Sequence, residues 1–169
     1  LISETNALGQ TTAYNYTDLE RISQIVDSLG NIERYTWTGA GRLNVYTNQA
    51  GQEFDYSTDP LGRLQQMNTP GQLERFVMSY SDSGLIENIR HNIENLNEDY
   101  VFNYYPNGLL ATAQTPDMTG QWEFSYDVMQ NLIGMTSPVG DSTDYEYDAL
   151  GRVIQRTLPD GAREEWEYD

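Results

Sequence analysis

The sequence predicts an all-β fold in which tandem β-hairpins pair side by side into one continuous, twisted antiparallel sheet. Three observations lead to this prediction. Aromatic residues recur two positions apart, which is the period of a strand with one buried face. Turn-forming Gly, Asp, Asn and Pro residues follow them at short intervals. Both features repeat about every 21 residues, so residues 1–169 are treated as one array of about eight hairpin units.

The repeat is clearest when the second aromatic residue of the sequence YEYD, Tyr147, is taken as the anchor of its unit. Successive anchors are separated by 21, 21, 22, 24, 22, 21 and 21 residues, and they are Tyr16, Trp37, Thr58, Tyr80, Tyr104, Tyr126, Tyr147 and Tyr168. The residues two positions earlier are all large and, with one exception, aromatic: Tyr14, Tyr35, Tyr56, Met78, Phe102, Phe124, Tyr145 and Trp166. Agreement at several separate positions makes the repeat a strong signal.

Each anchor ends a first strand and is followed by a turn such as Asp148–Gly151, Asp59–Gly62 or Tyr105–Gly108. Arginine recurs five residues after four anchors, as Arg21, Arg42, Arg63 and Arg152. The next residue is aliphatic and opens the second strand: Ile22, Leu43, Leu64, Ile86, Leu110, Leu132 and Val153. A second turn closes the unit at or near Gly9, Gly30, Gly51, Gly71, Gly120, Gly140 and Gly161. One hairpin of this size is not stable alone, so neighbouring hairpins must pair.

The stretch between Tyr80 and Tyr104 departs most from the repeat. Ile86, Ile89, Ile93 and Leu96 have a spacing that also suits one face of a helix. The flanking residues favour strands, and the phase of the neighbouring units favours a longer hairpin. We therefore expect a hairpin with its turn near residues 94–98, with the helix as the alternative.

Composition and charge exclude several classes of protein. The net charge is −17, with nine Arg and no Lys, which argues against nucleic-acid binding and indicates a soluble acidic surface. The absence of cysteine excludes disulfides, Cys-ligated zinc and thiol nucleophiles. Apolar runs are too short to span a membrane. The spacing of a calcium loop or a phosphate-binding glycine loop is absent, so no cofactor and no metal are expected.

The sequence YEYDALGRVIQRTLPDG, Tyr145 to Gly161, resembles the YD repeat of the Rhs family. Relatives in that family include bacterial polymorphic toxins, insecticidal toxin complexes and the animal teneurins. The acid that follows the anchor in the family pattern is present as Asp59, Asp127, Asp148 and Asp169, and is replaced by Thr17, Thr38, Ser81 and Tyr105. The last complete unit therefore matches best.

The resemblance implies a long β-sheet that spirals into a large hollow shell around a C-terminal toxin or cargo domain. It implies a bacterial protein that is secreted or lies at the cell surface. It also implies that the partners are flanking repeats and the cargo domain of the same parent protein. Because Leu1 lies in the middle of the repeat phase and Asp169 follows an anchor, we expect a piece cut from a longer array at both ends.

Structural roles are expected for the polar residues that could form a site. Asp148 and Arg152 are expected to brace a turn, as are Asp59 and Arg63, and His91 is expected to be a solvated surface residue. The sequon Asn15-Tyr16-Thr17 matches an N-glycosylation acceptor, a triplet that often arises by chance. No catalytic, cofactor-binding or metal-binding residue is assigned.

The predicted function is therefore a non-enzymatic structural module, a wall segment of a toxin-like protein. The alternative is a carbohydrate-binding or adhesive module that uses exposed Tyr and Trp residues. The aromatic rows are expected to form a packed ladder on the buried face of the sheet. An isolated stretch would expose two strand edges without Lys to protect them, so edge-to-edge self-association is also expected.

Overall fold

The computed structural model describes residues 2–94 and 96–169, and it is built almost entirely from strands. One short 3-10 turn, Pro70–Gln72, is the exception among the described elements. The strands are β1 Ile2–Thr5, β2 Thr11–Tyr16, β3 Ile22–Val26, β4 Ile32–Trp37, β5 Leu43–Thr47, β6 Glu53–Thr58, β7 Leu64–Asn68, β8 Glu74–Tyr80, β9 Ile86–Ile93, β10 Leu96–Tyr104, β11 Leu110–Gln114, β12 Trp122–Tyr126, β13 Leu132–Thr136, β14 Ser142–Tyr147, β15 Val153–Thr157 and β16 Arg163–Glu165.

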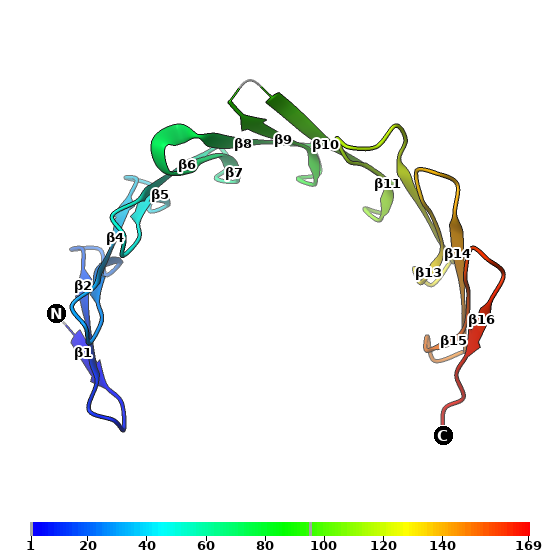
Figure 1. Ribbon diagram of the computed structural model, residues 1–169, viewed down its shortest axis with the longest axis horizontal. Helices are drawn as coiled ribbons and strands as arrows, with labels where there is room; N and C mark the ends of the chain where they lie inside the picture. Colours follow the sequence, from blue (N-terminus) through cyan, green and yellow to red (C-terminus); the bar gives the residue numbers. More distant parts are fainter. Residues whose placement is uncertain (1, 95) are drawn as a thin grey trace. The chain divides into compact units, whose positions relative to one another are not determined.

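The strands form one 16-stranded sheet in which hydrogen-bonded neighbours follow the order of the chain, β1 to β16. Pairings such as β1–β2, β2–β3 and β14–β15 are antiparallel, as expected when connections of two to seven residues join consecutive strands. The prediction of a continuous antiparallel sheet of hairpins is confirmed. The chain divides into two compact units, one of residues 1–78 and 90–97 and the other of residues 79–89 and 98–169. Figure 1 shows the hairpins of each unit following one another along the chain.

The irregular stretch is a hairpin, so the helix alternative is wrong. Strand β9 ends at Ile93, Glu94 lies in the turn with a φ of 50°, and β10 begins at Leu96. The turn is tighter than the predicted 94–98, because Glu98 already lies within β10. The two strands have eight and nine residues, which accounts for the longer interval between Tyr80 and Tyr104.

The repeat phase coincides with the strand boundaries. Every anchor from Tyr16 to Tyr147 is the last residue of an even-numbered strand, and every aliphatic residue of the next phase opens the following strand. In six hairpins the anchor is the partner of that aliphatic residue, as in Tyr147↔Val153, with a register shift just before it. The recurrent shift is a β-bulge, in which two residues of one strand oppose one residue of its partner.

Twelve of the turns share one hydrogen-bond pattern. The first residue's N–H donates to the fifth residue's carbonyl, and the fourth residue's N–H donates to the first residue's carbonyl. The fourth residue has a positive φ in all twelve, and it is glycine except at Glu20 (58°) and Gln130 (70°). The repeated glycines therefore supply a left-handed conformation that other residues adopt at a cost.

Side chains sort onto two faces of the sheet. Partners in register share a face, and one face carries Tyr35, Tyr46 and Phe54 in unit 1 and Phe102, Trp122 and Phe124 in unit 2. This aromatic face holds rings in lateral contact: the centroids of Tyr35 and Tyr46 are 5.2 Å apart, and those of Tyr46 and Phe54 are 5.8 Å apart. The opposite, polar face carries residues such as Ser125, Thr136 and Asp144.

The expected packing of the aromatic rows on a buried face is wrong. Among residues 2–94 and 96–169, no hydrophobic side chain is fully buried, and the single buried residue is Gly134. One sheet without a covering layer leaves its rings half-exposed, because each ring is covered only by its neighbours in the same sheet. The cohesion of this fold must therefore come from contacts within the sheet.

Candidate functional site

The recurrent structural site lies where one hairpin meets the next. We call this place a seam: the second strand of one hairpin paired with the first strand of the following hairpin. Apart from β1–β2, the described seam ladders are shorter than those of the hairpins. Between β3 and β4 it ends at Gln24↔Arg34, whereas the hairpin ladder of the same strand β3 continues to Ile22. The seams between β5 and β6 and between β13 and β14 likewise hold three residue pairs each.

A shortened ladder leaves backbone groups at the anchor end of a seam without a strand partner, and in four seams the next anchor supplies a bond. The indole N–H of Trp37 donates to the carbonyl of Ile22 at 2.8 Å. The hydroxyls of three tyrosine anchors donate in the same way at 2.8 Å, Tyr104 to Ile86, Tyr147 to Leu132 and Tyr168 to Val153. A half-buried carbonyl that would otherwise be unpaired is thereby satisfied. Burial raises the pKa of the Tyr147 hydroxyl, in keeping with its partly covered position.

Three of the recurrent arginines, Arg21, Arg42 and Arg152, contact the next hairpin at the same place. The Arg152 guanidinium carbon lies 4.4 Å from the centroid of the Tyr168 ring, and that of Arg21 lies 5.9 Å from the Trp37 ring. The guanidinium of Arg21 also fills the space where a side chain at Gly41 would lie, and that of Arg42 does so at Gly62. The glycine of the turn thus serves two purposes, a positive φ and room for the arginine of the preceding hairpin.

Sequence reasoning missed this contact between neighbouring hairpins. It assigned the tyrosines to a ladder and the arginines to their own turns. The shared phase of Arg21 with Trp37 and Gly41 is the signal that could have shown it, because residues 16 and 20 positions apart recur together.

The turn pair predicted at Asp148 and Arg152 is confirmed. One oxygen of Asp148 accepts the backbone N–H groups of Leu150 and Arg152, each at 2.9 Å. The other oxygen accepts the Nε–H of Arg152 at 2.6 Å. Asp59 and Arg63 form the same pair at 2.7 Å, so the DPLGR sequence is an ordinary turn of the repeat.

These hydrogen bonds stabilise the ionised carboxylates. The backbone N–H of Arg152 lowers the pKa of Asp148, and hydrogen bonds from the side-chain amides of Asn31 and Asn131 lower those of Asp27 and Asp127. All three carboxylates are partly buried at turns. Their arrangement is that of turn-bracing groups, not of a catalytic pair.

The prediction that His91 is a solvated surface residue is wrong. Its side chain is 13% exposed, its ring stacks on Phe76 with centroids 4.1 Å apart, and its Nε2 lies 3.3 Å from a carboxylate oxygen of Glu74. His91 therefore takes a place in the aromatic face. Asn15 of the sequon lies within strand β2 and donates from its amide nitrogen to Gln24 at 2.6 Å.

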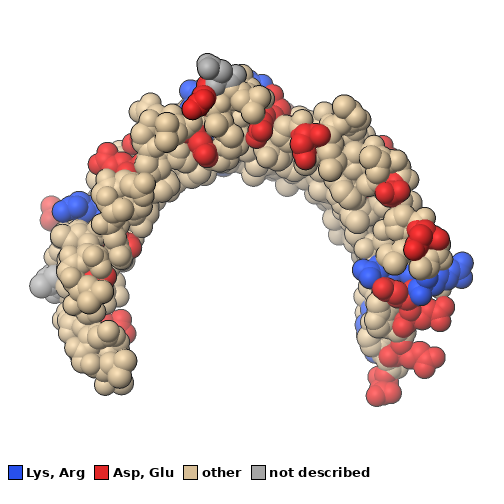
Figure 2. All heavy atoms as spheres, in the orientation of Figure 1, with Lys and Arg blue, Asp and Glu red and all other residues tan. Residues whose placement is uncertain are grey.

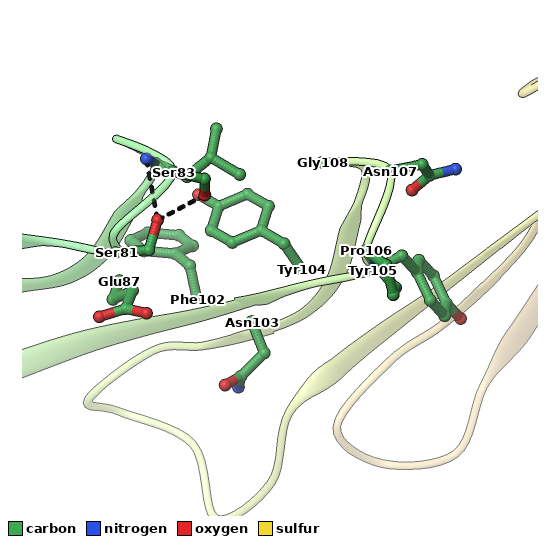
Figure 3. A pocket seen from close by; sticks show the side chains of 11 residues that line it. Ser81, Ser83, Glu87, Phe102, Asn103, Tyr104, Tyr105, Pro106, Asn107 and Gly108 are labelled. Atoms are coloured by element: carbon green, nitrogen blue, oxygen red, sulfur yellow. Dashed lines mark hydrogen bonds between the residues drawn. The ribbon is translucent and has the colours of Figure 1, made fainter.

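Several clefts open on the surface, and they recur at equivalent places in the repeat. A cleft of about 540 Å³ lies between the turn that contains Ser81 and strand β10 in unit 2. Figure 3 shows the hydroxyl of Ser81 bonded to Ser83, with Phe102 and Tyr104 on one side of the strand and Asn103 on the other. A cleft of about 430 Å³ beside Trp37 occupies the same position at a seam of unit 1. The clefts are thus products of the repeat, not one specialised pocket.

The acidic residues lie on the surface, as the net charge of −17 predicts. In Figure 2 acidic atoms are spread along both units, and arginine atoms gather near the C-terminal strands, where Arg156 and Glu164 lie 2.5 Å apart. Within the described ranges, no group of His, Asp and Glu residues could hold a metal ion. The same ranges contain no helix that is long and apolar enough to cross a membrane.

The chain was compared with protein-family models and with curated protein sequences. The RHS Repeat family model matches residues 130–163, which confirms the resemblance to the Rhs/YD-repeat family drawn from Tyr145–Gly161. A search of curated protein sequences found no match.

Solved toxin structures share the fold. The Tc holotoxin pore of Photorhabdus luminescens matches with a TM-score of 0.76 and 16% identity, over 88% of this chain and 9% of that one. The crystal structure of TcdB2-TccC3 matches with a TM-score of 0.78 and 16% identity, over 92% of this chain and 10% of the other. TcdB2-TccC3 without its hypervariable C-terminal region matches with a TM-score of 0.79 and 16% identity, over 92% of this chain and 10% of the other. The chain spans about a tenth of the length of these toxin chains.

The seam hydrogen bond can be tested by removing one hydroxyl. Tyr147→Phe keeps the ring but leaves the carbonyl of Leu132 without its donor, so we expect the free energy of unfolding to fall by about 1 kcal/mol. Urea denaturation measures the change. Tyr145→Phe is the matched control, because the described structure shows no hydrogen bond for that hydroxyl. Equal losses in both variants would contradict the seam role.

The seam between β5 and β6 offers the reverse test, since its anchor is Thr58. A threonine side chain is too short to reach the carbonyl as Trp37 and Tyr147 do. Thr58→Tyr should supply the missing donor to Leu43 and raise the free energy of unfolding by about 1 kcal/mol. Thr58→Phe supplies the ring alone and should gain less in the same denaturation experiment. A tyrosine variant no more stable than the phenylalanine variant would rule out the hydroxyl as the cause.

The lowered pKa values of the turn carboxylates indicate that the fold loses thermal stability at low pH. The folded-state pKa values of Asp27, Asp127 and Asp148 lie below the unfolded value of about 3.9. Their contribution is therefore complete well above pH 4 and is lost as the pH falls through the folded-state pKa values. The thermal midpoint should drop between pH 6 and pH 3, and less so in the double variant Asp127→Asn, Asp148→Asn. Asp18→Asn, at an exposed turn position, is the control, and an unchanged slope in the double variant would refute the assignment.

Proposed function

We propose that this chain is a non-enzymatic stretch of wall from a large secreted toxin-like protein of the Rhs/YD-repeat kind, and that the wall encloses a C-terminal cargo domain. The observation that carries the proposal is the match to TcdB2-TccC3 without its hypervariable C-terminal region. The likeness persists when that region is missing, so it concerns the part of the toxin that remains without the hypervariable region.

The geometry supports a barrier. All described strands belong to one sheet with neighbours in chain order, so each strand adds a fixed width of about 4.8 Å to a sheet of backbone hydrogen bonds. The anchor rings close the seams at the places where the ladders stop. A thin sheet with closed seams covers much area with few residues, which suits enclosure.

The aromatic residues support cohesion over glycan binding. A ring that binds a sugar must offer an open face, whereas Arg152 lies over the ring of Tyr168 and His91 lies on that of Phe76. The hydroxyls of Tyr104 and Tyr147 are donors to backbone carbonyls. These rings and hydroxyls are therefore engaged in the sheet itself.

The proposed setting follows from the same comparison. Flanking repeats would continue the sheet beyond β1 and β16, and the cargo domain of the same parent protein would lie within the wall. Secretion suits a toxin whose cargo must be withheld from the cell that makes it. An isolated stretch would expose both outer strands, so we also propose edge-to-edge self-association when the chain is studied alone.

Limited proteolysis of the intact parent protein tests the enclosure. The segment that follows the repeat array should resist proteinase K while the wall is intact. The double variant Gly41→Leu, Gly62→Leu places side chains where Arg21 and Arg42 lie and strains both turns, so it should open two seams and expose the cargo to cleavage. Gln65→Ala, at an exposed strand position, is the control. Cargo that is cleaved as fast within the intact protein as when expressed alone would refute the wall.

A further inference from the structure

The seam between β11 and β12 is held by fewer ladder contacts than the other seams of the described structure. Its ladder has two residue pairs, Thr112↔Glu123 and Ala113↔Trp122, whereas the other described seam ladders have three or four pairs. Strands β11 to β14 all lie within unit 2, so this seam can be compared directly with the β13–β14 seam. A seam with fewer backbone hydrogen bonds separates at a lower free energy.

The connection between β11 and β12 differs from the common turn. Seven residues, 115–121, form this connection, whereas five residues, 137–141, join β13 to β14. Two backbone hydrogen bonds of 2.8 and 2.9 Å close the shorter turn, but the longer connection shows one, from the N–H of Met118 to the carbonyl of Thr115 at 3.4 Å. The hydroxyl oxygen of Thr115 is buried and has no hydrogen-bond partner in the described structure, which makes the closed connection less stable.

The anchor end of this seam also departs from the repeat. The described structure shows no hydrogen bond for the hydroxyl of Tyr126, whereas the hydroxyl of Tyr147 closes the β13–β14 seam. The bond at β11–β12 comes instead from Tyr105, whose hydroxyl donates to the carbonyl of Phe124 at 3.0 Å and whose ring meets that of Tyr126 edge to face. Figure 3 shows the rings of Tyr104 and Tyr105 pointing in different directions, because Tyr104 bonds to the preceding hairpin and Tyr105 to the next one.

Tyr105 lies at a turn position that the other hairpins fill with a shorter side chain. The first residues of the other turns that follow an anchor are Thr17, Thr38, Asp59, Ser81, Asp127 and Asp148. Leu109 stands at the position of the recurrent arginines, so this hairpin lacks the contact that Arg21 and Arg152 make with the next hairpin. Tyr105 is 42% exposed, so water competes for the one side-chain hydrogen bond that spans the seam at this end.

Two clefts lie beside the seam. One of about 390 Å³ opens on the polar face next to Glu123 and Ser125, and one of about 430 Å³ lies at the anchor end next to Tyr126. Tyr105 lines both clefts. Water can therefore reach the seam from both clefts and replace the backbone hydrogen bonds when the strands separate.

We propose that the β11–β12 seam is where unit 2 opens first, and that the hydroxyl of Tyr105 is the latch that holds this seam closed. Opening separates the hairpin β10–β11 from the hairpin β12–β13, and each hairpin keeps its own ladder of four pairs. The short seam ladder, the unsatisfied hydroxyl of Thr115 and the exposed latch all lower the free energy of this one step. In the proposed wall this step would open the sheet at a fixed place, but the opening itself does not depend on the wall function.

Native-state amide hydrogen exchange on the whole chain tests the proposal, because it measures the opening of each seam. Ladder amides of β11–β12 should exchange about tenfold faster than those of β13–β14. Tyr105→Phe keeps the ring and removes the latch, so exchange at β11–β12 should rise by about a further fivefold. Tyr147→Phe is the matched control, because it removes the donor at β13–β14 and should speed exchange there and not at β11–β12.

A second variant should close the seam. Residues 115–120 are replaced by the five-residue sequence of Ser137–Asp141, which keeps the register of the ladder and brings Gln114 opposite Gln121 as a third pair. Exchange at β11–β12 should then slow to the rate found at β13–β14. This variant tests the seam by a gain of protection, which a chain that fails to fold cannot imitate.

Three results would overturn the proposal. Equal protection at β11–β12 and β13–β14 in the unaltered chain would show that unit 2 has no preferred opening. Exchange that Tyr105→Phe leaves unchanged, or raises equally at both seams, would show that Tyr105 is not the latch. Exchange at β11–β12 that stays as fast after the connection is replaced would show that ladder length does not set the opening. These results leave the proteolysis test of the wall unaffected, so the two proposals fail independently.

Discussion

The hydrogen bond from an anchor side chain to the backbone of the preceding hairpin is the interaction on which this sheet depends. Hairpin ladders and seam ladders differ in length. The hairpin ladder β2–β3 continues past a bulge to the pair Tyr16↔Ile22, whereas the seam ladder β3–β4 stops at Gln24↔Arg34. The seam therefore opens at its anchor end. Trp37 and Tyr147 close it with a donor at 2.8 Å and an apolar ring in one side chain. Few residues other than Tyr and Trp combine these properties. This explains why Tyr or Trp recurs at most anchor positions along the chain.

A sheet of one layer cannot rely on a buried core. The described residues include no fully buried hydrophobic side chain, so each hairpin is stabilised by its neighbours in the sheet. Ring contacts such as Tyr35 with Tyr46, turn carboxylates such as Asp148, and arginines placed over the next glycine all act between adjacent segments. Stability in such an array is a sum of local terms and nearest-neighbour terms. The same property lets a wall grow by adding hairpins without redesigning a core.

Periodicity made most of the fold predictable. The anchors and aliphatic residues marked strand ends to the residue, as at Tyr147 and Val153. The flanking residues and the repeat phase together favoured a hairpin over a helix in the stretch between Tyr80 and Tyr104. Contacts between neighbouring hairpins were not predictable in this way. Arg21 and Gly41 are 20 residues apart in sequence, and their proximity depends on the width of a hairpin. His91 was misplaced because its polar flanks conceal the strand alternation that puts it beside Phe76. The expected buried face required a second layer that nothing in a strand pattern specifies.

Native-state amide hydrogen exchange tests the central claim most directly, because it reports the opening of each seam separately. The seams β3–β4, β5–β6 and β13–β14 hold three residue pairs each, but only β5–β6 has threonine as its anchor. If anchor side chains close the seams, amides of the β5–β6 ladder should exchange faster than those of β3–β4 and β13–β14. Equal protection at the three seams, or slower exchange at β5–β6, would show that backbone pairing alone holds the hairpins together.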